Sequence, residues 1–156
     1  MPLQGNVSPI TGEFKIDVTP YGPASPQGGV HDIPNNAPYN IIDKDNSYHV
    51  HVQLDLAGNL VALQGHNVTY TVLLESMGPG FEGKVGEKVN TFGPMVTPSF
   101  TDDVWISCGT PTSDGVGEGV YKLVVVATME TQTGVPLGIV GFDEGTFIQV
   151  YDDIAL

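Results

Sequence analysis

Two histidines spaced two residues apart, His49 and His51, are the sharpest chemical feature of the sequence. Residues two apart in a β-strand lie on the same face, so both imidazoles would point the same way. Gln53 and Asp55 continue that face. Because imidazole and carboxylate groups are common ligands of zinc and related divalent metals, His49, His51 and Asp55 form a candidate metal site. A metal-dependent enzyme or a metal-binding protein is therefore one functional hypothesis, with a divalent metal ion as its cofactor.

The histidine pair also has a simpler interpretation. A cupin-type metal site would add a glutamate within a glycine-bearing motif a few positions on, and residues 50–55 contain neither glycine nor glutamate. A half-exposed strand carries polar residues on its solvent face in any case. We favour this interpretation of the pair, in which no cofactor is involved.

Alternating oxygen-bearing side chains in Asp43-Lys44-Asp45-Asn46-Ser47 are typical of calcium-binding loops. The EF-hand loop also needs a glycine at its sixth position and a glutamate at its twelfth, where Tyr48 and Leu54 stand here. A looser calcium site, with Asp43 and Asp45 joined by carboxylates of a second loop, stays open. The interpretation that we favour is Asx-turn chemistry ahead of a strand.

Trp105 is the only tryptophan, and with Tyr121 it could offer an aromatic platform to a sugar ring. A carbohydrate-binding or small-ligand-binding sandwich is thus a further hypothesis, with Trp105 as its ligand-binding residue. A core or interface position for Trp105 is the simpler interpretation. The glycine-rich stretch 115–119 lacks the lysine of a phosphate-binding loop, so nucleotide binding is not indicated.

Charge and composition restrict the partners and the location. Eighteen acidic and five basic residues give a formal net charge of −13, so neither nucleic acid nor an anionic membrane is expected as a partner. No window approaches the roughly 18 apolar residues of a membrane span, and residues 1–6 do not look like the start of a signal peptide. We therefore expect a cytoplasmic protein. The single cysteine, Cys108, excludes an internal disulfide and is expected to be a small buried apolar residue.

Apolar alternation identifies the elements that would position these residues. The longest apolar run, residues 119–129, is rich in β-branched residues and predicts a buried strand. It places Tyr121, Leu123 and Val125 on one face and Val120, Val124 and Val126 on the other. Further strands are expected at 14–18, 48–56, 67–75, 81–89 (at a sheet edge), 103–108 and 145–151, with a short apolar piece at 60–63 and a crossing loop or short strand at 135–142.

In the strand expected at 145–151, Phe147 and Val150 are predicted to be buried. The acidic residues, Asp102 among them, are expected in turns and on the surface. No segment has a sustained apolar period of 3.6, so no helix longer than about two turns is predicted.

About seven to nine strands, with turn signals roughly every ten residues, predict an all-β, antiparallel two-sheet sandwich. Residues 114–123 resemble the beginning of strand F of immunoglobulin-like domains, where a tyrosine after a glycine-rich corner bonds back to the preceding loop. Tyr121 stands at that position. Leu123 stands where the second immunoglobulin cysteine would fall, so the resemblance implies an immunoglobulin-like fold type and no particular family.

Residues 1–38 are rich in proline and glycine and predict an extended N-terminal arm, in the same domain as the sandwich at 39–156. Such an arm can wrap the domain or reach a neighbouring subunit. The strand at 119–129 has two apolar faces, so the face outside the core needs a cover from the arm or from a second subunit. The sequence shows no group of residues typical of a catalytic site. The leading hypothesis is therefore a non-catalytic interaction or structural module that forms a homo-oligomer such as a dimer, or binds a protein partner.

Overall fold

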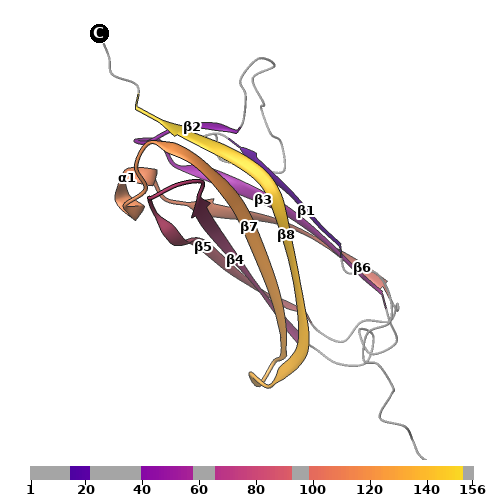
Figure 1. Cartoon of the computed structure of the whole chain (residues 1–156). Coiled ribbons are helices and arrows are strands. Elements are labelled where there is room, and N and C mark those ends of the chain that lie inside the picture. The colour runs from indigo at the N-terminus through magenta and orange to yellow at the C-terminus, as the bar shows by residue number, and fades with distance from the viewer. Residues whose placement is uncertain (1–14, 22–39, 58–65, 93–98, 153–156) are drawn as a thin grey trace, which may run out of the picture.

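The computed structural model of the chain describes residues 15–21, 40–57, 66–92 and 99–152. Within these ranges the protein is nearly all β, with eight strands and one single-turn helix (Figure 1), so the all-β prediction is confirmed. The elements are β1 (Lys15–Tyr21), β2 (Ile41–Asp43), β3 (Tyr48–Ala57), β4 (His66–Ser76), β5 (Glu82–Phe92), β6 (Ser99–Cys108), α1 (Pro111–Asp114), β7 (Gly119–Thr131) and β8 (Pro136–Tyr151). No helix in the described ranges has the length and apolar character to cross a membrane.

The strands form two sheets. One contains three strands in the order β1-β3-β6, and the other contains five in the order β2-β8-β7-β4-β5. Neighbouring strands pair antiparallel, except that the three-residue β2 runs parallel to the end of β8. The long strands β7 and β8 curve strongly along their length (Figure 1). Of the predicted arm, β1 is described, whereas most of residues 1–38 and the apolar piece at 60–63 lie outside the described residues.

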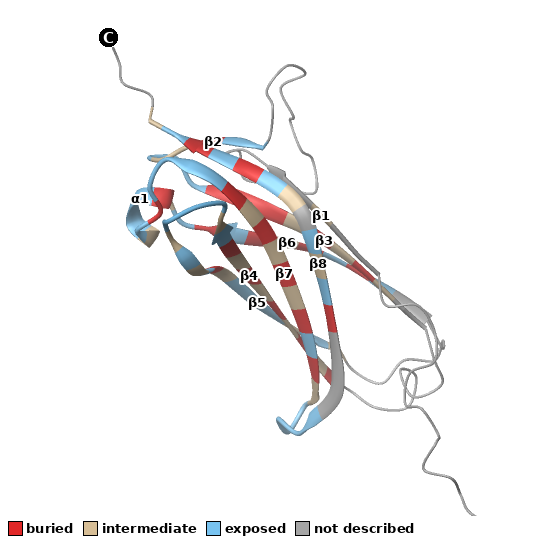
Figure 2. Ribbon diagram, viewed as in Figure 1, coloured by how far each residue is buried: buried red, intermediate tan, exposed pale blue. Residues whose placement is uncertain are grey.

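One hydrophobic core contains inward-facing residues of both sheets. Along β7 every second residue from Tyr121 to Met129 is buried, and the residues between them are half-buried or exposed, as the alternating colours in Figure 2 show. The same alternation buries Val50, Val52 and Leu54 of β3. The faces predicted for these two strands are therefore correct, because a pleated strand sends successive side chains to opposite sides.

A tyrosine closes the corner before β7. The hydroxyl of Tyr121 donates a hydrogen bond to the backbone carbonyl of Gly117 at 2.8 Å. Just upstream, α1 is capped by Thr110, whose side chain accepts from the Ser113 amide at 3.1 Å. The helix ends at Gly115, whose φ of 79° lies in the left-handed region that favours glycine.

A buried polar cluster joins the two sheets. Asp102 of β6 is 8% exposed and accepts hydrogen bonds from the Tyr70 hydroxyl at 2.6 Å and from Nδ2 of Asn90 at 2.9 and 3.2 Å. Burial, and then the bond to Asp102, raises the pKa of Tyr70 far above its usual range. The expectation of a surface turn at Asp102 is wrong, because β6 begins at Ser99 and the alternation along it turns Asp102 inward with Val104 and Ile106.

The C-terminal third of the chain differs from the prediction. Instead of a crossing loop or short strand at 135–142 and a separate strand at 145–151, β8 runs without a break from Pro136 to Tyr151, with a register shift around Gly145 where it pairs with β7. Phe147 was expected to be buried with Val150, but it is 44% exposed whereas Val150 is buried. No register shift lies between Phe147 and Val150, so these residues, three positions apart, face opposite sides of the sheet and could not both point inward.

Candidate functional site

The polar face predicted on β3 lies on the outside of the three-stranded sheet. His49, His51, Gln53 and Asp55 alternate with core residues of β3, so they do share one face. His49 is nevertheless buried, and the other three are half-buried. The face is thus less open to water than the sequence suggested.

The neighbouring strand β6 supplies the contacts of His51. Trp105 is its cross-strand partner, and the two rings stack with centroids 4.2 Å apart at an interplanar angle of 22°. Nε2 of His51 also contacts Oδ1 of Asp103, which stands two residues before Trp105 on β6. A stacked indole and a carboxylate therefore both contact the histidine.

The candidate metal ligands have other partners in this arrangement. Oδ1 of Asp55 accepts a hydrogen bond from the Thr101 hydroxyl at 2.6 Å, and Nε2 of His51 faces Asp103. Throughout the described ranges, no three or more histidine, cysteine or acidic side chains are placed so that they could hold one metal ion. His51 and Asp55 thus each contact a side chain of β6, and His49 lies buried on the same strand face.

Trp105 is half-buried on the same face, and its ring is stacked against His51. Its backbone carbonyl also accepts a hydrogen bond from the Lys88 ammonium of β5 at 3.5 Å. Tyr121, the other aromatic of the expected sugar platform, lies buried on β7 in the five-stranded sheet. The two aromatics are therefore not brought together.

The candidate calcium ligands Asp43 and Asp45 belong to a tight turn between β2 and β3. Oδ1 of Asp43 accepts from the amide of Asp45 at 2.9 Å, which is an Asx-turn contact. Oδ1 of Asp45 accepts from the Thr112 hydroxyl at 3.0 Å, so this side chain ties the turn to α1. Between them, Lys44 pairs with Asp152 at 3.1 Å. Its hydrogen bond to Asp152, together with the nearby acidic charges, raises the pKa of Lys44.

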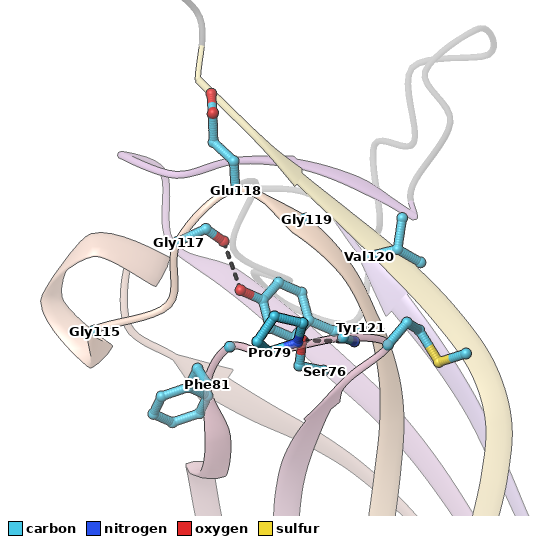
Figure 3. Close-up of a pocket in the computed structure, with 12 residues that line it drawn as sticks. Ser76, Pro79, Phe81, Gly115, Gly117, Glu118, Gly119, Val120 and Tyr121 are labelled. Carbon is cyan, nitrogen blue, oxygen red and sulfur yellow. Dashed lines mark hydrogen bonds between the residues drawn. The ribbon is translucent and has the colours of Figure 1, made fainter.

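Sequence reasoning missed a pocket at the end of the molecule that carries α1. The turn between β4 and β5 forms one wall, and the segment that leads from α1 into β7 forms the other (Figure 3). The pocket has a volume of about 490 Å³. Its signal in the sequence was the pair of glycine-rich breaks at 76–80 and 115–119, which look like ordinary turns.

The outer face of the five-stranded sheet carries a set of exposed apolar side chains. Phe142 of β8 is 65% exposed, Val120 of β7 is 47% exposed and Phe147 of β8 is 44% exposed. Phe142 stands opposite Val126, which is half-buried on the same face. We call Val120, Val126, Phe142 and Phe147 the outer apolar patch.

No family model and no curated protein matches the sequence. Among solved structures, the fold is similar to that of a protein from Archaeoglobus fulgidus, with a TM-score of 0.42, 14% identity and coverage of 88% of this chain and 97% of that one. Two crystal structures of a β-glucosidase from Listeria innocua are also similar. The one in complex with isofagomine has a TM-score of 0.40 and 9% identity, and the other has 0.39 and 10%. This chain spans 16% of the length of each β-glucosidase chain.

Proposed function

We propose that the protein is a non-catalytic interaction module with an immunoglobulin-like sandwich fold, and that it self-associates through the outer apolar patch. The two sheets with their shared core, and the hydrogen bond from Tyr121 to Gly117, support the fold type. The observation that carries the function is the exposure of Phe142, Phe147 and Val120 on one sheet face. Apolar patches of this kind on a folded protein mark interaction surfaces.

The charges around the outer apolar patch favour a second copy of the chain as its partner. The Lys122 ammonium lies 3.8 Å from a carboxylate oxygen of Glu75 and 3.7 Å from one of Glu144, and Lys84 pairs with Glu87 at 2.8 Å within β5, the edge strand of the same sheet. A protein with a net charge of −13 repels its own copies over most of its surface. A face with both signs of charge reduces that repulsion and lets two copies match lysine to glutamate.

The test is the oligomeric state as a function of concentration. We expect light scattering to show a mass above that of the monomer at high micromolar concentration. Phe142→Lys combined with Phe147→Lys should return the protein to a monomer, because a charged side chain in an apolar interface is left without a partner. Val135→Lys is the matched control, since Val135 is 57% exposed in the turn between β7 and β8. A wild-type protein that stays monomeric at high micromolar concentration would remove the proposal.

A further inference from the structure

The pocket beside α1, which we call the loop-end pocket, is formed by segments about 40 residues apart in the sequence. One wall is the turn 76–81 and the other is the segment 115–121. Its volume of about 490 Å³ falls within the roughly 300–1,000 Å³ of sites that hold small ligands or parts of a peptide. It is separate from the outer apolar patch except at Val120, which borders both.

Hydrogen bonds hold the walls in place without a ligand. The amide of Met77 donates to the carbonyl of Val120 at 3.1 Å, which ties the two walls together. Within one wall the Tyr121 hydroxyl bonds to the carbonyl of Gly117 (Figure 3). A pocket that is already formed spares a ligand the free-energy cost of ordering its walls.

The walls expose backbone because five of the twelve lining residues are glycines. A Cβ atom added at Gly78 or Gly117 would meet no atom within 4 Å, so the space beside both residues is open. An extended peptide laid in the pocket can therefore approach the backbone closely. Phe81, Pro79 and Met77 add apolar surface, on which the aliphatic stem of a lysine or arginine can lie.

The charge around the pocket is negative. Among the described residues that line it, Glu118 is the only charged one, and its side chain extends from the rim away from the Tyr121 ring (Figure 3). Lys44 is the basic residue near this end of the molecule. Its pKa is raised by its hydrogen bond to Asp152 and by the negative charges of Asp152, Asp45 and Glu118. Three carboxylates around one ammonium leave this end of the molecule acidic, and that charge favours a cationic ligand.

From these observations we propose that the loop-end pocket binds an extended, lysine- or arginine-bearing segment of a partner protein. The partner is a different protein, because the five lysines of a second copy lie within its own strands or in the turn between β2 and β3 and offer no free extended segment. In the complex the glycine walls contact the peptide backbone, Phe81 and Pro79 contact the stem of a basic side chain inside the pocket, and Glu118 pairs with a basic side chain at the rim.

The test is a titration of the full chain with a capped glycine–lysine–arginine–glycine peptide, followed by amide NMR. We expect shifts at the amides of Gly78, Gly80, Gly115, Gly117 and Gly119, and none with a peptide in which glutamates replace the basic residues. Gly78→Leu should weaken binding at least tenfold because the leucine occupies the pocket. Glu118→Gln should weaken it about threefold, as expected for an exposed ion pair.

Glu130→Gln is the matched control, because it removes one negative charge at the far end of β7 and should leave binding unchanged. Equal weakening by Glu130→Gln and Glu118→Gln would show attraction by net charge alone and would overturn the proposal. So would unchanged binding in a Gly78→Leu protein with a wild-type melting curve. The oligomeric state of both pocket variants should match the wild type, so failure here is distinguishable from failure of self-association.

Discussion

At the scale of single residues, the fold changes the acid–base chemistry of the Cys108 thiol. It is 3% exposed, and burial raises the pKa of its thiol to about 12. In the unfolded chain the pKa of a cysteine thiol is about 8.5. Between these two values the folded protein keeps the proton and the unfolded chain loses it, so deprotonation favours unfolding. The contribution of Cys108 to stability is thus complete below about pH 8.5 and is lost as the pH rises toward about 12.

We therefore predict that the free energy of unfolding falls by about 1.4 kcal/mol per pH unit above pH 8.5, or about 2 kcal/mol by pH 10. Urea denaturation at pH 8 and at pH 10 measures this difference. Cys108→Ala should remove most of it, because the variant has no thiol to titrate. An equally steep loss in the variant would assign the effect to other groups.

At the scale of elements, local alternation was enough to predict the faces of β3 and β7, because each pleated strand carries that information in its own residues. The continuity of β8 was not predictable in the same way. Gly145 and its neighbours look like a turn in the sequence, and only pairing with β7 carries the strand through them. The loop-end pocket was missed for a related reason, since its two walls meet only after β4 and β7 pair.

The two faces of β7 allow a direct test of the element. Val125 is fully buried and Val124, the preceding residue, is half-buried on the outer face. We predict that Val125→Asp abolishes folding, because a buried unpaired carboxylate costs several kcal/mol whether it stays charged or takes up a proton. Val124→Asp should cost only about 1 kcal/mol, since its carboxylate reaches water. Thermal melting followed by circular dichroism compares the stability of the two variants. A wild-type melting curve for Val125→Asp would show that β7 does not form the core.

At the scale of the whole molecule, the question is what aligns the two sheets. Apolar packing alone specifies the alignment of the two sheets only weakly. The Asp102 carboxylate, in contrast, needs its hydrogen-bond donors in fixed positions. Tyr70 and Asn90 supply them from β4 and β5, across the core from β6. The sequence offers little sign of this cluster, because its three members are far apart in the chain and an aspartate is most often exposed.

We predict that Asp102→Leu lowers the free energy of unfolding by about 3 kcal/mol, because the Tyr70 hydroxyl and the Asn90 amide lose their buried acceptor. Adding Tyr70→Phe and Asn90→Leu removes those unsatisfied donors, so the triple variant should recover at least half of the loss. Urea denaturation of the four proteins of this series, including Tyr70→Phe/Asn90→Leu, measures both steps. If the cluster also aligns the sheets, the recovered triple variant should show broader amide NMR signals on β6 than the wild type. A triple variant as unstable as Asp102→Leu would instead mean that the aspartate stabilises the fold through its volume and position, and that the hydrogen bonds between the sheets contribute little.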